Sequence, residues 1–241
     1  MPRDTVNEVQ TNASMRASAL SVLEAHNIIE PPVNIYQILK DEEIPVDFWG
    51  FQSKIEGLYI NDVTGVGIAI NANRHPVKKR FTAAHELKHH RHDGFRSGLM
   101  CNTDVERLSI EQRANRFAAE ILMPPDFMRT VSKELDGEGL LTATILTTIF
   151  HVSYEAVVYR LNTLGLITDG QKNKLLKPTA RKEDSREAYA HRASGNAARL
   201  RTTAAIAAFS SSDGFSHCGN CSNLILDSRW RVCHSCGGVL T

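Results

Sequence analysis

Two histidines set one helical turn apart constrain this chain more than any other feature of its sequence. The stretch "FTAAHELKHHRHD" (81–93) places His85 and His89 four residues apart, with Glu86 directly after the first. At 100° per residue the two imidazoles lie about 40° apart on one edge of a helix, so both can reach the same metal ion. Pro76 suits the first turn of that helix, where its missing N–H is harmless. The sequence therefore predicts a helix that begins at Pro76 and carries two metal ligands.

The same motif has a second interpretation, because a short histidine-rich helix can also be a solvated surface. We expect the neighbouring His90 and His92 to be surface residues of that kind. A bound zinc ion lowers the pKa of a water molecule from about 16 to about 7, and Glu86 is placed to take the proton. A catalytic zinc needs three protein ligands and one open position. The metal interpretation thus depends on a third ligand.

Glu111 is the best candidate for that third ligand. It lies in a second expected helix, 109–123, which has its own apolar face and is stopped by two prolines. Asn115 follows one turn later, where it would hydrogen-bond a ligand histidine and fix its tautomer. Glu120 is the rival, but it falls on a different face of the helix and we expect it to be solvated. Two helices would then provide a complete catalytic metal site.

Segments typical of β-strands precede the metal helix. The stretches "IPVDFWGF", "EGLYIND" and "GVGIAIN" are rich in aromatic and β-branched residues, and "NDVTG" between the last two is typical of a hairpin turn. Helices are expected before them, over 15–28 and 33–42. We therefore expect an α+β fold that is mostly helical and contains a small antiparallel sheet.

The stretch over 140–167 has the spacing of a helix-turn-helix, with the turn at His151–Ser153. A second helix that reads DNA should expose Arg, Lys, Asn or Gln, and this one offers Arg160 and Asn162 in an otherwise mostly apolar segment. We prefer a structural interpretation, in which the pair is a helical lid or a substrate-docking subdomain. Specific DNA binding is the lesser alternative.

The C-terminal stretch contains two C-x-x-C pairs with eleven residues between them. Each pair can provide half of a tetrahedral zinc site, and a segment as short as 216–241 needs a metal to fold. The expected ligands of this structural zinc are Cys218, Cys221, Cys233 and Cys236. The alternative is a pair of redox dithiols, which usually lie at a helix start in a larger fold. We expect a zinc ribbon.

Composition restricts the compartment and the partners. The net charge of +1 predicts no nucleic-acid partner. No apolar run is long enough to cross a membrane, and the N-terminal stretch lacks the apolar segment of a secretory signal. We expect a cytoplasmic protein without a membrane partner, whose five cysteines are reduced or metal-bound. Residues 171–215, which are basic and rich in Ala and Ser, are expected to form a linker with one marginal helix.

The two metal-motif segments together resemble a known family. "RFTAAHELKHH" followed by "EQRANRFAAEILMP" is similar to the ImmA/IrrE family of zinc metallo-endopeptidases, and the likeness extends over about residues 15–167. The resemblance implies a zincin-like, more closely gluzincin-like, metallopeptidase domain, which we place at 15–130. The helix-turn-helix-like subdomain follows at 131–170.

The resemblance also implies residue roles and a substrate class. It carries over His85, His89 and Glu111 as ligands of the catalytic zinc and Glu86 as the catalytic base. It further implies proteolysis of a regulatory protein, a helix-turn-helix transcriptional repressor, which would switch on stress or mobile-element genes. One position departs from the pattern: Lys88 stands where many members have Gly, and we expect it to point outward.

The sequence does not identify the group that stabilises the oxyanion. Tyr154, Tyr159 and His151 are candidates, although core or surface roles are the simpler interpretation of each.

Two functional hypotheses follow from these features. The first is a zinc endopeptidase with one catalytic and one structural zinc that cleaves a regulatory protein. The second is a DNA-associated regulatory protein that uses the helix pair and the ribbon and has a non-catalytic metal site. A purely structural zinc would not need Glu86 beside it, and this favours the first hypothesis.

Overall fold

The computed structural model describes most of the chain, and it divides into two compact units that are treated separately below. The residues described are 3–52, 54–93, 104–137, 141–193, 232–233 and 237–239, with the side chains of 3–12, 104–107 and 188–193 left aside. The first unit holds Met1–Ile28, Asn34–Leu122 and Val232–Val239. The second unit holds Ile29–Val33, Met123–Arg231 and Leu240–Thr241. No described helix is both long and apolar enough to span a bilayer.

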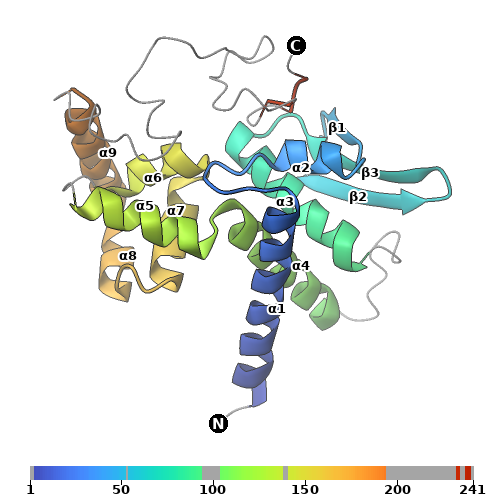
Figure 1. The fold of residues 1–241 in the computed structure, drawn as a ribbon, viewed down its shortest axis with the longest axis horizontal. Coiled ribbons are helices and arrows are strands. Elements are labelled where there is room, and N and C mark those ends of the chain that lie inside the picture. Colours follow the sequence, from blue (N-terminus) through green and yellow to red (C-terminus); the bar gives the residue numbers. More distant parts are fainter. Residues whose placement is uncertain are drawn as a thin grey trace. The chain divides into compact units, whose positions relative to one another are not determined.

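The first unit combines helices with one small sheet (Figure 1). Its helices are α1 (Arg3–Ala25), α2 (Ile35–Asp41), α3 (Pro76–Asp93) and α4 (Asp104–Leu122). Its strands are β1 (Val46–Trp49), β2 (Gly57–Asp62) and β3 (Gly65–Asn71). The α+β class that we predicted from the sequence is confirmed.

The helix ends follow local chemistry where the sequence gave a clear signal. The metal helix α3 begins at Pro76, as predicted, and runs to Asp93. Asn34 caps α2, because its side-chain oxygen accepts a hydrogen bond from the Gln37 backbone N–H. The helix that we predicted over 109–123 is α4, which starts five residues earlier at Asp104 and ends before the two prolines.

The sheet has the strand order β1-β3-β2, so β2 lies at one edge. β2 and β3 form the predicted antiparallel hairpin, in which Tyr59 is opposite Ile68. β1 instead runs parallel to β3, with Val46 opposite Ile68. Our prediction of a wholly antiparallel sheet is therefore wrong for β1. The strand pattern predicts extended backbone but not which strand each segment pairs with. β1 and β2 lie on opposite sides of β3, so the chain crosses from one edge of the sheet to the other between them.

Helix α3 is the centre of the first unit. It packs on β2, β3 and α2, while α4 packs against α3 and α1 against α4. Apolar side chains from all of these elements fill the core: Val22, Ile35, Ile38, Leu39, Ile68, Ile70, Ala83, Ala84, Leu87, Ala114, Phe117, Ala118 and Ile121. The predicted apolar face of α4 is thus buried. Because α3 is held from three sides, the edge that carries His85 and His89 has a fixed direction.

The second unit is helical. Its described helices are α5 (Pro125–Gly137), α6 (Ala143–Phe150), α7 (Tyr154–Thr163), α8 (Asp169–Leu175) and α9 (Pro178–Ala193). The predicted helix pair corresponds to α6 and α7, and His151 ends α6 in the left-handed conformation with a φ of 52°. We predicted one marginal helix in the stretch after Gly170, and the structure has α9 there as well as most of α8.

Helix α9 is tied to α6 by a carboxylate. Asp184 is buried and accepts hydrogen bonds from the Ala143 and Thr144 backbone N–H groups at 3.1 and 2.8 Å. These are two of the N–H groups that a helix start leaves without a partner in its own helix. The local sequence around Asp184 gives no sign of this tertiary contact, so the composition alone suggested a linker.

The cysteine stretch is described only in part. Cys233 is buried, and Val232 forms an isolated antiparallel bridge with Val239. The Asn34 side-chain amide donates to the Val232 carbonyl at 2.8 Å, which joins this stretch to the start of α2. The other three predicted ligands of the structural zinc, Cys218, Cys221 and Cys236, lie outside the described residues.

Candidate metal centre

Three side chains from two helices converge beside the edge of the sheet. His85 and His89 come from α3, and Glu111 comes from the middle of α4. The two Nε2 atoms of the histidines are 3.1 Å apart. Glu111 Oε2 lies 3.1 Å from His85 Nε2, and its Oε1 lies 3.7 Å from His89 Nε2. The structure thus brings together the three residues that the sequence predicted as ligands.

The donor atoms have the spacing that a tetrahedral ion requires. Two ligand atoms that are each 2.0–2.1 Å from a tetrahedral zinc are about 3.3 Å from one another. The distance between the two Nε2 atoms is 3.1 Å, that from His85 Nε2 to Glu111 Oε2 is 3.1 Å, and that from His89 Nε2 to Glu111 Oε1 is 3.7 Å, all close to that value. Two imidazole nitrogens and one carboxylate oxygen are also a common donor set of catalytic zinc. Geometry and donor chemistry both fit the metal.

Hydrogen bonds on the far side of each imidazole explain why a cation fits the site. His85 Nδ1 is 3.0 Å from Asn115 Oδ1, and His89 Nδ1 is 2.8 Å from Asp93 Oδ2. Both partners are oxygens that accept, so each Nδ1 carries the hydrogen and each Nε2 is left with a bare lone pair. Two lone pairs and the Glu111 carboxylate then face one another. A cation placed between them would be attracted by all three groups at once.

Electrostatics at His85 point in the same direction. Burial alone would lower the pKa of its imidazole, but the hydrogen bond to Glu111 and the charges of Glu86 and Glu111 raise that pKa above its usual value. The surroundings of His85 therefore favour positive charge at this position. A metal ion provides that charge without a proton.

The partner of His85 was expected from the sequence, whereas the partner of His89 was missed. Asn115 lies one turn after Glu111 and meets His85 as predicted. Asp93, the last residue of α3, lies one turn after His89 and was not considered. The same i, i+4 spacing that pairs His85 with His89 could have identified it.

Lys88 was wrongly expected to point outward. Its side chain is 1% exposed and forms an ion pair with Asp93. Burial would raise the pKa of the Asp93 carboxyl, but hydrogen bonds from His89 and Lys88 and their charges hold that pKa at about 2. Asp93 is therefore a carboxylate. The helical position of Lys88 predicted a surface only because we assumed that no counterion lay inside.

Glu86 occupies the position that a general base needs. Its side chain is buried, and burial raises the pKa of its carboxyl, against the opposing charges of His85 and His89. Its carboxylate also receives a backbone hydrogen bond from Tyr59 in β2. A Cβ atom at Gly57 would lie 3.1 Å from Glu86 Oε1 and 2.4 Å from Thr82 Cγ2. Only glycine at position 57 lets β2 approach α3 this closely.

A cleft of about 600 Å³ opens over these groups. Its lining combines the three candidate ligands and Glu86 with Asn115, Asp93 and residues 54–59, which lead into and form the start of β2. Among the strands that the structure describes, β2 pairs with β3 alone, and on one side. Glu56 uses its carbonyl to accept from Asn71 N–H at 2.9 Å, so by alternation the backbone groups of Gly57 and Tyr59 point to the opposite edge, along the cleft.

The other polar residues near α3 and α4 have structural contacts. Glu120, the rival ligand, is 2% exposed and pairs with Arg116, so our expectation that it is solvated is wrong. His90 is half-buried and lies 3.1 Å from the Tyr59 hydroxyl, whereas His92 is exposed, as expected, and contacts Ser18.

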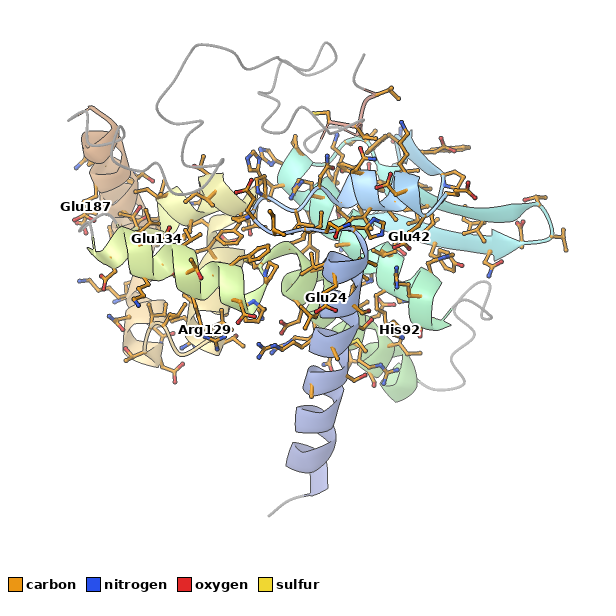
Figure 2. The ribbon with its side chains drawn as sticks, viewed as in Figure 1. Glu24, Glu42, His92, Arg129, Glu134 and Glu187 are labelled. Atoms are coloured by element: carbon orange, nitrogen blue, oxygen red, sulfur yellow. The ribbon has the colours of Figure 1, made fainter. Side chains whose placement is uncertain are left out.

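Glu42 ties the end of α3 to α1 and α2. Glu42, which is labelled in Figure 2, accepts from Arg91 of α3 and lies 3.0 Å from His26, which follows α1. These contacts, together with the one between His92 and Ser18, fix the C-terminal turns of the metal helix on its outer side.

The second unit uses its candidate residues differently. Arg160 is 2% exposed, and its Nε donates to the Met123 carbonyl at 3.0 Å. Asn162 lies within hydrogen-bonding distance of the Ile167 carbonyl, Asp169 and Lys172. Both side chains that we considered for DNA contacts are therefore engaged inside the second unit.

The candidates for oxyanion stabilisation also belong to the second unit. Tyr154 is buried, and burial raises the pKa of its phenol to about 12. Tyr159 is exposed and His151 is half-buried at the end of α6.

Comparison with known proteins places these observations in a family. Residues 44–162 match the model of the Peptidase_M78 family, described as the IrrE N-terminal-like domain. This is narrower than the stretch 15–167 over which we noted the resemblance, but it contains all of the candidate site. No curated protein matches the chain.

One solved structure similar to the chain is a Mycobacterium tuberculosis transcriptional regulator. It is 16% identical, with a TM-score of 0.49, over 62% of this chain. The chain spans 46% of the length of that structure. Through its residues 44–162, the chain belongs to the ImmA/IrrE family of peptidases.

Proposed function

We propose that this chain is a zinc-dependent endopeptidase, with His85, His89 and Glu111 as zinc ligands and Glu86 as the general base. One observation carries the proposal: His85, His89 and Glu111 each offer one ligand atom, and these atoms lie within 4.8 Å of one another. A buried carboxylate lies directly beside them. Membership of a peptidase family agrees with this assignment.

The residues of the site have separate roles in peptide hydrolysis. His85, His89 and Glu111 would hold the zinc, which would supply Lewis-acid chemistry to the scissile carbonyl and to the attacking water. Glu86 accepts the proton of that water and can later deliver it to the leaving amine. Burial and the Tyr59 backbone hydrogen bond hold its carboxylate in place. Asn115 keeps His85 in the tautomer that presents Nε2.

We further propose that the substrate binds as an extended strand beside β2. A scissile carbonyl must reach both the metal and Glu86, which requires an extended segment in the cleft. The free edge of β2 offers backbone groups for such pairing, as in other cases where a peptide adds a strand to a sheet. Pairing of this kind selects for an unfolded segment and only weakly for side chains.

The proposed substrate is a regulatory protein, a helix-turn-helix transcriptional repressor whose cleavage releases stress or mobile-element genes. This part rests on the family resemblance. Because backbone pairing gives little specificity, selection of one repressor would come from docking away from the cut, through α6 and α7 or through the C-terminal stretch. We therefore expect a single cut in a flexible segment of the repressor.

We also propose that Cys218, Cys221, Cys233 and Cys236 hold a second, structural zinc. The described part brings Cys233 and Gly237 together: the Cys233 carbonyl accepts from Gly237 N–H at 2.9 Å, and Gly237 has a φ of 74°. Glycine after a C-x-x-C pair permits the turn that directs both sulfurs to one side. The full chain would then bind two zinc ions.

The alternative, a DNA-associated regulator, receives little support from the second unit. Arg160 and Asn162 were its two candidates for base contacts, and both are engaged by other groups of the protein. The exposed side chains of α7 include Glu155 and Tyr159, and an acidic residue at the start of a recognition helix would repel phosphates.

The test uses the purified full chain with zinc and the helix-turn-helix repressors of the same organism, beginning with any encoded beside its gene. Mass spectrometry of the products should find one cut, which a chelator abolishes. Rapid, indiscriminate digestion of casein would instead indicate a general protease. Because Asp184 of α9 caps α6, a shortened chain used to test remote docking should end after residue 193.

A further inference from the structure

The two histidine ligands are supported by different chemistry. His85 Nδ1 meets the neutral amide oxygen of Asn115, which comes from the neighbouring helix α4. His89 Nδ1 meets the carboxylate of Asp93, which comes from the end of its own helix. A carboxylate acceptor makes an imidazole a stronger metal ligand than a neutral acceptor does, because it stabilises positive charge on the ring.

The same Asp93 oxygen receives a second donor. Oδ2 accepts from His89 Nδ1 at 2.8 Å and also from Lys88 Nζ. Lys88 and His89 are adjacent in sequence, yet both side chains are buried, and they approach Asp93 together. Two donors on one oxygen restrict the carboxylate far more than either donor alone.

Packing alone does not explain why the Lys88 side chain is buried. A buried ammonium group is strongly unfavourable unless a counterion accompanies it, and an apolar side chain of similar length would fill the same space at less cost. Its ammonium group is instead paired with Asp93, which also contacts the His89 imidazole. Its position suits a role in orientation.

We propose that Asp93 and Lys88 are positioning residues of the metal centre. Asp93 keeps the hydrogen of His89 on Nδ1 and turns Nε2 toward the metal, and Lys88 holds the Asp93 carboxylate in that orientation. This inference rests on the proposed zinc site but goes beyond its three ligands and general base. In the competing account, the ion pair merely fastens the last turn of α3.

Four variants of the full chain separate the two accounts: Asp93→Asn, Lys88→Met, the double variant, and Glu120→Gln as the matched control. Glu120 is the buried member of a separate ion pair with Arg116, and neither residue takes part in the cleft lining. Zinc affinity is measured by competition with a chromophoric chelator. The Co²⁺ absorption spectrum reports the ligand field at the histidine site, after subtraction of the spectrum of His85→Ala, and thermal unfolding reports stability.

The positioning account predicts that zinc affinity and thermal stability change differently across these variants. Asp93→Asn should weaken zinc binding about 10- to 100-fold, the usual effect of losing a partner of a ligand histidine. It should also lower the melting temperature, because Lys88 becomes a buried charge without its partner. The double variant should regain stability, since no charge is left unpaired, while its zinc affinity stays as low as that of Asp93→Asn.

Lys88→Met should weaken zinc binding less than Asp93→Asn, and it should add no further loss when Asp93 is already Asn, because Lys88 acts through Asp93. Glu120→Gln should leave zinc affinity and the Co²⁺ spectrum unchanged even if it lowers stability. If Asp93→Asn is too unstable to purify, the double variant gives the same comparison.

Two results would overturn the inference. One is wild-type zinc affinity and an unchanged Co²⁺ spectrum in Asp93→Asn or the double variant. The other is zinc affinity that recovers together with stability in the double variant. If His85→Ala still loses the metal under the same conditions, the proposal of a zinc site would stand although the positioning inference had failed. Failure of the wild-type chain to bind Zn²⁺ or Co²⁺ at His85 would refute the site and the inference together.

Discussion

In the first unit, polar side chains from α3 and α4 converge on one point, whereas in the second unit the buried side chains of Arg160 and Asp184 end on backbone groups. His85, His89 and Glu111 face one another: the two Nε2 atoms are 3.1 Å apart, and oxygens of Glu111 lie 3.1 and 3.7 Å from them. Asp184 instead accepts from the start of α6, and Arg160 donates to a carbonyl. Polar groups therefore indicate a functional site where several metal-ligating side chains converge on one another, and they mark architecture where they end on backbone groups of the fold.

Removal of a ligand should have the largest effect on this comparison. Glu111→Ala leaves two imidazoles without the carboxylate that completes the donor set, so zinc at this site and peptidase activity should disappear together. Metal analysis of the purified variant, beside the wild-type chain, measures the loss of one zinc per chain. A variant that still holds the wild-type amount would move the third ligand elsewhere, although Glu120 is now excluded by its buried pairing with Arg116.

The close approach of β2 to α3 should be the next most sensitive feature. In Gly57→Ala the new methyl would meet Thr82 Cγ2 at 2.4 Å, so the strand must move away from Glu86. A displacement of about 1 Å at a reacting group can lower the rate by roughly 100-fold. We expect a loss of kcat of that order with zinc content unchanged. Full activity in Gly57→Ala would show that β2 takes no part in positioning the substrate.

Loss of a buried polar contact in the second unit should lower the stability of the protein without changing its zinc content. Asp184→Ala removes the acceptor of two N–H groups at the start of α6, and each unsatisfied buried donor costs about 1–3 kcal/mol. Chemical denaturation should therefore find a lower free energy of unfolding. Zinc content measured on the same samples should equal that of the wild type. A loss of zinc would contradict the separation between the two regions.

The smallest expected effect is at the start of α7. Ser153 caps this helix by accepting from Ala156 N–H at 3.2 Å. Ser153→Ala should lower the free energy of unfolding by about 1 kcal/mol, the usual effect of losing such a cap. Peptidase activity at moderate temperature should not change, and Ser153→Asp, which can cap as well, serves as the control.

Local patterns in the sequence predicted the parts of this structure that depend on neighbours along the chain. The spacing of His85 and His89, the start at Pro76 and the turn at His151 are all properties of a single segment, and each was placed correctly. The same is true of the apolar face of α4. Convergence of Glu111 on the histidines came from the family resemblance and from its place beside an apolar stripe.

Features that depend on distant partners were missed. The parallel pairing of β1 requires knowledge of where the chain passes, and the cap that Asp184 forms on α6 joins residues about forty positions apart. Lys88 was assigned to the surface because a lone lysine in a helix usually is. Its burial follows only once Asp93 is recognised as its counterion.

The central claim is that Glu86 acts as a base beside a zinc ion that it does not bind, and Glu86→Gln tests it most directly. Glutamine keeps the size and the polar contacts of the side chain but cannot accept the proton. Zinc per chain and the rate of cleavage of the repressor are measured on the same preparation. The account predicts zinc equal to the wild type and a rate lower by about two to four powers of ten. Wild-type cleavage by Glu86→Gln would contradict it.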